Sequence, residues 1–256
     1  MRDHHAKALE KATARLLALE TGTLAIILGG SIAKGIDREE SDVDLIVVLP
    51  DERYAERLKE NNVSFLWYDI PGYEGGLVEG RFVSRSFIRE AAARGSEPTR
   101  FSFIRACPVY CIDAEIPDIL PRIPVYPENS RSKNLTAFFS QLQCNRAFFW
   151  DQGKRNRYLQ IRAASDIVHF GCRLILAHNR LLYPGQRRLI EVTLAAPGKP
   201  DQFEQKMNAF LVQLTDETKE DFCMMMEKIA DWGKDDRYIL DVEMSWFNQV
   251  HAVAEW

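Results

Sequence analysis

The feature that most constrains this chain is an apolar run that stops at two glycines, followed by a second apolar run that opens with two aspartates. The first run, Thr23 to Leu28, is aliphatic and β-branched and ends at Gly29-Gly30. The second starts at Asp42-Val43-Asp44 and ends before Pro50. Both runs predict buried strands, and Ser31 to Gly35 between them fits a short helix with Ser31 near its N-cap.

The residues at the two junctions suit a phosphate and a cation. Glycine has no Cβ, so a phosphate can approach Gly29 and Gly30 closely, and the Ser31 hydroxyl adds a donor at the start of a helix. In a strand alternate side chains share a face, so Asp42 and Asp44 point the same way while Val43 points to the core. Two such carboxylates are oxygen ligands of the kind that Mg²⁺ takes together with substrate phosphates.

Two other phosphate-binding motifs are absent. A P-loop requires G-x-x-x-x-G-K-[ST], but Gly30 is followed by Gly35-Ile36. A dinucleotide fingerprint requires G-x-G-x-x-G, and Gly29-Gly30 has the wrong spacing.

The segment from Leu28 to Leu49 resembles the signature of the DNA polymerase β-like nucleotidyltransferase superfamily. That signature is Gly-Ser, about ten residues, and then Asp-x-Asp at a strand, and it matches here at Gly30, Ser31, Asp42 and Asp44. The resemblance implies a mixed-sheet α/β (α+β) domain that binds an NTP with two Mg²⁺ ions. It assigns Asp42 and Asp44 to catalysis and metal binding, and Gly29, Gly30 and Ser31 to the nucleotide.

The superfamily usually has a third carboxylate on a neighbouring strand. Glu79 in Leu77 to Phe82 is the candidate catalytic and metal-binding residue, although Glu79-Gly80 is equally good turn chemistry between two strands. Asp69 is the alternative, and the absence of any third acid would leave turnover in doubt. Lys34 is a candidate contact to the triphosphate, against the simpler interpretation of a solvated surface lysine.

The pattern changes character after Pro121. Residues 5–19 predict an amphipathic helix, and strands and helices alternate up to Ile112, with Glu79-Gly80 read as a turn. Beyond the prolines of Ile123 to Pro127 only helical periodicity remains. The chain is therefore predicted to have a nucleotidyltransferase domain over residues 1–123 and an all-α, substrate-binding bundle over residues 124–256 that covers the active-site cleft. The helices expected in the bundle are 129–151, 156–178, 185–194, 201–213, 217–232 and 238–254.

The helical half offers weaker signals. A polar stripe is formed by Arg162, Asp166, His169 and Arg173. It is interpreted first as a solvated face, with a wall facing the active-site cleft as the alternative. The segment from Asn179 to Leu189 resembles part of the helical domain of bacterial antibiotic nucleotidyltransferases. The resemblance implies that Arg187 or Arg188 lies near the substrate or the phosphates of the nucleotide, with a plain surface position as the equal alternative for both. Adjacent histidines near a terminus, here His4-His5, are not counted as a metal pair.

Overall composition limits the kinds of binding partner and cellular compartment that are expected for this chain. The formal net charge is -4, and a basic excess would accompany binding to long nucleic acid, so DNA is excluded and RNA is disfavoured. The cysteine count is odd and no CxxC occurs, which predicts reduced thiols in a cytoplasmic protein. No apolar run is long enough to span a membrane, and Met1 to Glu20 does not read as a signal peptide.

The predicted activity is Mg²⁺-dependent transfer of an NMP, with AMP from ATP favoured, to a hydroxyl of a small-molecule acceptor. By resemblance the acceptor is of the aminoglycoside or lincosamide type. Two alternatives stay open: nucleotidyl transfer to protein or RNA, and a non-catalytic nucleotide-binding or antitoxin-like partner protein.

Overall fold

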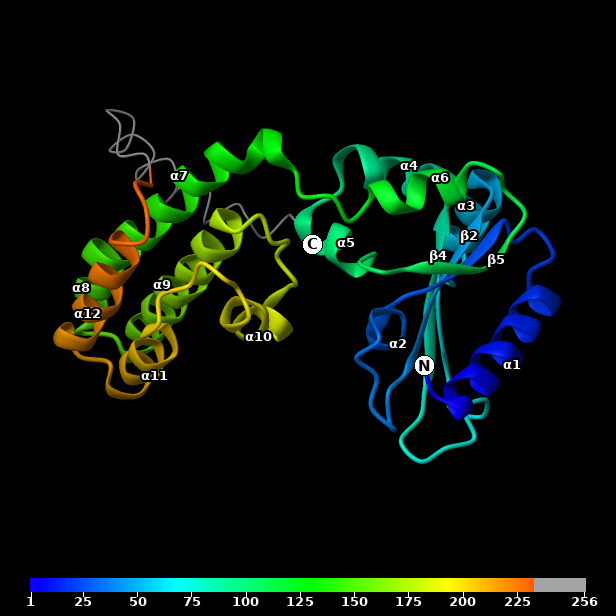
Figure 1. Cartoon of the computed structure of the whole chain (residues 1–256), viewed down its shortest axis with the longest axis horizontal. Helices are drawn as coiled ribbons and strands as arrows, with labels where there is room; N and C mark the ends of the chain where they lie inside the picture. Colours follow the sequence, from blue (N-terminus) through cyan, green and yellow to red (C-terminus); the bar gives the residue numbers. More distant parts are fainter. Residues whose placement is uncertain (233–256) are drawn as a thin grey trace. The chain divides into compact units, whose positions relative to one another are not determined.

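The computed structural model describes residues 1–232 and divides the chain into two compact units, Met1–Val125 and Tyr126–Trp256. The first unit is a mixed sheet with helices and the second is helical (Figure 1). This confirms the predicted fold class. The helix expected over 238–254 lies outside the described residues. Within residues 1–232, no helix combines the length and the apolar character that a membrane crossing needs.

The sheet of the first unit has five strands in the order β3-β4-β2-β1-β5. Strands β2 and β4 run parallel, and the other neighbouring pairs are antiparallel. The strands are β1 (Ala25–Leu28), β2 (Val43–Leu49), β3 (Ser64–Trp67), β4 (Val78–Ser84) and β5 (Cys107–Cys111).

The two faces of the sheet pack on different helices. On one face, α1 (Asp3–Leu19) buries Ala8, Ala12 and Leu16 in a cluster that includes Val43 and Leu45. On the opposite face, Ile27, Val48 and Val83 pack with α4 and α6. The helices of this unit are α1, α2 (Gly30–Lys34), α3 (Asp51–Lys59), α4 (Arg85–Arg94), α5 (Glu97–Ser102), α6 (Ile116–Ile119) and the 3-10 turn η1 (Leu120–Arg122).

One prediction about the sheet is wrong. Glu79-Gly80 is not a turn, because both residues lie inside β4. The glycine serves packing instead: a Cβ at Gly80 would lie 2.4 Å from Cζ of Phe65 and 2.6 Å from the carbonyl oxygen of Leu45. A side chain there would push β3 and β2 away from β4, so the sequence needs glycine without turning the chain.

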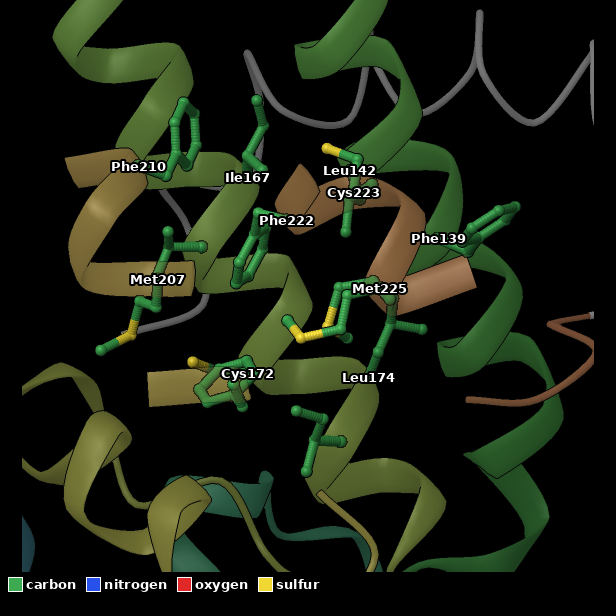
Figure 2. Close-up of a cluster of buried hydrophobic side chains, with 14 of the residues drawn as sticks. Phe139, Leu142, Ile167, Cys172, Leu174, Met207, Phe210, Phe222, Cys223 and Met225 are labelled. Atoms are coloured by element: carbon green, nitrogen blue, oxygen red, sulfur yellow. The ribbon is translucent and has the colours of Figure 1, made fainter. Parts of the chain in front are cut away.

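The second unit is built around α9 (Arg157–His178), whose buried residues share one hydrophobic core with residues of the neighbouring helices (Figure 2). Phe139, Leu142, Ile167, Phe210 and Phe222 from four helices meet in its core. The predicted helix 129–151 is interrupted by a π-helical turn. The elements are α7 (Glu128–Cys144), η2 (Asn145–Phe149), α8 (Trp150–Gly153), α9 (Arg157–His178), η3 (Gln186–Arg188), α10 (Leu189–Leu194), α11 (Phe203–Gln213) and α12 (Asp216–Glu227).

Candidate active site

The Gly29-Gly30-Ser31 turn connects β1 to α2 and lies against the start of β2. The amide of Gly29 donates to the carbonyl of Asp44 over 2.9 Å. Gly30 has a φ of +65°, and a Cβ built on it would lie 1.6 Å from Oδ2 of Asp44. Gly30 is therefore required both by its left-handed backbone and by the carboxylate that occupies the space of a side chain.

The carboxylates follow from the alternation of β2. Val43 and Leu45 are buried, while Asp42 and Asp44 are only partly buried. In the parallel pair of β2 and β4, Asp44 is the Cα partner of Glu79. Glu79 therefore lies on the neighbouring strand beside Asp44 and on the same face of the sheet.

Burial raises the pKa of Asp44 to about 7, and a hydrogen bond with Glu79 and the negative charges of Glu79 and Asp42 add to this effect. Lys34 opposes it through its positive charge. Two carboxyl groups in contact repel each other when both are ionised, and this repulsion favours the protonated form of Asp44. The site is a concentration of negative charge that a cation would stabilise.

The donor set fits Mg²⁺ in its chemistry, because it consists of carboxylate oxygens on one face of a sheet. Within residues 1–232, no three His, Cys, Asp or Glu side chains are preassembled as a metal site. Asp44 and Glu79 instead bond to each other. A bound cation would take the place of the proton on Asp44 and bring in Asp42, whose charge already acts on Asp44.

The loop that delivers Asp42 is fixed by hydrogen bonds. The Ser41 side chain accepts from the amide of Arg38 over 2.8 Å. The Tyr73 hydroxyl donates to the carbonyl of Ser41 over 2.7 Å, and the negative charge of Asp42, together with burial as the larger cause, raises the pKa of Tyr73. Tyr73 thus holds the residue immediately before Asp42.

Helix α1 also contacts this loop. His5 is fully buried, with Nδ1 3.3 Å from Oδ2 of Asp37 and Nε2 3.2 Å from the carbonyl of Glu39. The rings of His4 and His5 also contact that of Tyr73. The sequence interpretation missed this role, although His5 precedes Leu9, Ala12 and Leu16 at helical spacing and so falls on the buried face of α1.

Lys34 closes α2 and lies near the carboxylates. Its ammonium stands 4.4 Å from the centre of the Phe101 ring. Arg105, a residue that the sequence interpretation did not single out, donates to the carbonyl of Lys34 over 2.7 Å. The end of α2 is therefore a positively charged region on the β1 side of Asp44.

The alternative third carboxylate, Asp69, binds a residue away from the site. Asp69 is exposed and accepts two hydrogen bonds from Arg15, over 3.1 and 2.8 Å. Of the two acids that the sequence offered as a third carboxylate, Glu79 is the one beside Asp44.

The remaining predicted residue, Arg187, lies exposed in η3 of the second unit, and its contact to a nucleotide stays a prediction.

The polar stripe of α9 is less exposed to solvent than expected. Asp166 bonds Arg162 over 2.7 Å with 16% of its side chain exposed. Burial, followed by the charges of Arg173 and Arg162, lowers the pKa of His169 to about 4.

Comparison with known proteins agrees with this geometry. Residues 9–90 match the family model described as "Nucleotidyltransferase domain". The matched segment includes the glycine turn, both aspartates and Glu79. Residues 9–90 therefore carry a nucleotidyltransferase domain, which confirms the predicted resemblance to the DNA polymerase β-like superfamily.

Other comparisons add little. A crystal structure of a nucleotidyltransferase-like protein from Exiguobacterium sibiricum 255-15 is similar with a TM-score of 0.46 and 13% identity. The match covers 95% of this chain and 80% of that one, and a likeness this weak carries no conclusion about function. No protein with a curated description matches the sequence significantly.

Proposed function

We propose that the chain is a Mg²⁺-dependent nucleotidyltransferase that moves AMP from ATP to a hydroxyl of a small-molecule acceptor. The observation that carries the proposal is the pairing of Asp44 with Glu79 across β2 and β4, next to a glycine whose missing side chain admits the Asp44 carboxylate. We place the reaction in the cytoplasm, since all five cysteines are free thiols.

In the proposed reaction the acceptor oxygen forms a bond to the α-phosphorus, and the bond from that phosphorus to the bridging oxygen of pyrophosphate breaks. Mg²⁺, when bound, supplies positive charge that offsets the charge on the phosphates. Asp42 and Asp44 bind the cation. Gly29, Gly30 and Ser31 hold the β- and γ-phosphates, and Lys34 adds a positive charge beside them.

Glu79 has two possible tasks in this proposal, which differ in their pH dependence. As a general base it takes the proton from the acceptor hydroxyl; as a ligand it adds an oxygen to the cation. In the first case Glu79→Gln removes the acidic limb of the pH–rate profile, while in the second it raises the Mg²⁺ concentration needed for half-maximal rate.

The test is pyrophosphate release, measured over the four NTPs and a panel of hydroxylated acceptors that includes aminoglycosides and lincosamides. Asp42→Asn and Asp44→Asn are expected to lower the rate by a factor on the order of 100 or more. Asp69→Asn is the matched control, because Asp69 is an exposed acid of the same unit, and it should keep the parent rate.

The outcomes separate the alternatives. Pyrophosphate release only with RNA or a protein substrate would replace the small acceptor. Binding of Mg²⁺ and ATP without any release would indicate a nucleotide-binding partner protein instead of an enzyme. Full activity in both Asn variants would overturn the assignment of the site.

A further inference from the structure

Strand β4 carries a charged residue next to Glu79 that the proposed chemistry does not use. Side chains at alternate positions share a face, so Arg81 lies on the same face as Glu79 and Val83. Val83 is buried in the cluster beneath α4 and α6, whereas Arg81 is exposed. The helical cover of this face therefore ends between Val83 and Arg81, and Arg81 lies on its open part with the carboxylates.

The sheet order separates two sides of this open face. The glycine turn and Lys34 adjoin β1, on one side of Asp44. Glu79 and Arg81 lie on β4, on the other side, followed by β3 at the edge. In an in-line displacement the attacking and leaving oxygens stand on opposite sides of the phosphorus. With pyrophosphate at the glycine turn, as the proposed function has it, the acceptor approaches over β4 and β3.

The surface on that side combines an apolar residue, a hydroxyl and a cation. The register of β3 and β4 sets Leu66 opposite Glu79 and Ser64 opposite Arg81, on the same face. Leu66 is 53% exposed although it is a large aliphatic residue in a strand. Phe65 and Trp67, by contrast, pack into the core of the other face.

Arg81 has no salt bridge or side-chain hydrogen bond to any residue in the described part of the chain, and the nearest acid along its own strand is Glu79. We propose that Arg81 binds an anionic group of the acceptor, a carboxylate or a phosphate monoester, while Leu66 contacts the acceptor's carbon skeleton. The guanidinium presents paired donors that match either oxyanion. This inference rests on the proposed function and specifies in addition that the acceptor is negatively charged.

The proposal narrows the acceptor class. A polycationic aminoglycoside would bring like charge to Arg81, so the acceptor is a hydroxylated acid and not a polyamine. The triphosphate is an unsuitable partner for Arg81, because Asp44 and Glu79 lie between β1 and the open position of Arg81. Loss of Arg81 should therefore weaken binding of the acceptor and leave binding of ATP unchanged.

The experiment compares glucose, glucose 6-phosphate, gluconate and glucosamine as probes. Their binding is measured calorimetrically in the presence of Mg²⁺ and a non-hydrolysable ATP analogue, and pyrophosphate release from ATP is followed in parallel. The variants are Arg81→Gln and Arg81→Lys. Arg122→Gln is the matched control, because Arg122 is an exposed arginine of the same unit in η1.

We expect glucose 6-phosphate or gluconate to bind on the order of tenfold more tightly than glucose, and glucosamine to bind more weakly. Arg81→Gln should abolish this preference, Arg81→Lys should keep part of it, and all variants should bind the ATP analogue equally. Three outcomes would overturn the role of Arg81. They are tighter binding of glucosamine than of the anionic probes, equal or absent binding of all four probes, and an Arg81→Gln variant that loses affinity for the ATP analogue alone. Absence of pyrophosphate release with the anionic preference intact would contradict the proposed function alone.

Discussion

At the scale of single residues, the site depends on two glycines that make room for different groups. Gly30 admits a carboxylate, and Gly80 admits the ring of Phe65 and the backbone of the neighbouring strand. Both are glycine because another atom occupies the position of a side chain. Only Gly30 also has a left-handed backbone.

Substitution of Gly30 tests this directly. Gly30→Ala puts a methyl group onto Oδ2 of Asp44 and a Cβ on a residue with positive φ. We expect a loss of about 1–3 kcal/mol in the free energy of unfolding, together with loss of nucleotidyl transfer because Asp44 is displaced. Urea unfolding and pyrophosphate release provide the two measurements.

Gly22 is the matched control for this substitution. A Cβ at Gly22 meets nothing within 4 Å, and its φ is not positive. Gly22→Ala should therefore leave stability unchanged or raise it by up to about 1 kcal/mol. Equal losses in the two variants would mean that the close approach of Gly30 and Asp44 does not matter.

Residue patterns predicted the local geometry of β2 well and the contacts around it poorly. The alternation at Asp42-Val43-Asp44 is local, so the bounds of β2 and the burial of Val43 between two partly buried aspartates follow from the sequence. The partners of Ser41 and Asp37 come from Tyr73 and His5, 32 residues away in each case. No local pattern reports such contacts, although the helical spacing of His5 with Leu9 already indicated burial.

At the scale of elements, the loop between α2 and β2 is the part that transmits support to the site. Tyr73→Phe removes only the hydroxyl that donates to Ser41. We expect it to cost about 0.5–1.5 kcal/mol of stability and to lower the rate of transfer several-fold, because Asp42 follows the freed carbonyl. Tyr68→Phe alters a tyrosine that is 73% exposed and should change neither quantity. An unchanged rate in Tyr73→Phe would remove Tyr73 from the support of Asp42.

The junction of α1 with α3 carries a buried ion cluster. Glu20 bonds Arg57 over 2.7 Å and Arg53 over 2.9 Å, with only 5% of its side chain exposed. The hydrogen bond from Arg53 is the largest cause that lowers the pKa of Glu20; burial opposes it, and Arg57 reinforces it. A depressed pKa in the folded state stabilises the fold above the unfolded pKa of about 4.3, and this contribution is lost as the pH falls through the folded value.

Glu20→Gln should therefore lower the free energy of unfolding by about 2–3 kcal/mol at pH 7, since it leaves Arg57 buried beside an uncharged amide. The difference from the parent should shrink as the pH falls below about 4. Chemical denaturation at several pH values measures it. Glu56→Gln changes a side chain that is 60% exposed and pairs with Arg53, and it should cost less than about 1 kcal/mol. A difference that is constant from pH 7 to pH 3 would contradict the ionic role of Glu20.

Element boundaries show where the sequence falls short. The glycine in Glu79-Gly80 does not by itself distinguish a turn from a strand, because tight turns and close packing of strands both require glycine. The ring of Phe65 in β3, which packs against Gly80, explains why the residue lies in a strand. The long helix predicted over 129–151 is broken by a π-helical turn at Asn145–Phe149, which leaves the apolar periodicity almost intact. In both cases the deciding atoms belong to another element.

At the scale of the whole molecule, the two units have separate cores. Among residues 1–232, the clusters around α1 and α4 contain residues of the first unit alone, and the cluster around α9 contains residues of the second unit alone. Thermal unfolding is therefore expected to show a ligand-sensitive transition for the unit that binds the nucleotide. The transition whose melting temperature rises when nucleotide is added identifies the unit that supplies the nucleotide contacts.

Mg²⁺ and a non-hydrolysable ATP analogue together should raise the melting temperature of the first unit more than either ligand alone. A ligand that binds only the folded state at a hundred times its Kd adds about 2.7 kcal/mol of stability, and the cation relieves the repulsion among Asp42, Asp44 and Glu79. Asp44→Asn preserves the shape of the side chain but removes its charge, so the joint shift should vanish. Asp69→Asn should retain the joint shift.

A second measurement concerns Arg187. Arg187→Gln should weaken binding of the ATP analogue about tenfold if Arg187 contacts the triphosphate. Arg188→Gln should leave this binding unchanged, because Arg188 already pairs with Glu191. Parent-like binding in Arg187→Gln would remove the helical unit's arginine from the nucleotide site, and parent-like binding in Asp44→Asn would show that the carboxylates of β2 do not bind the metal–nucleotide complex.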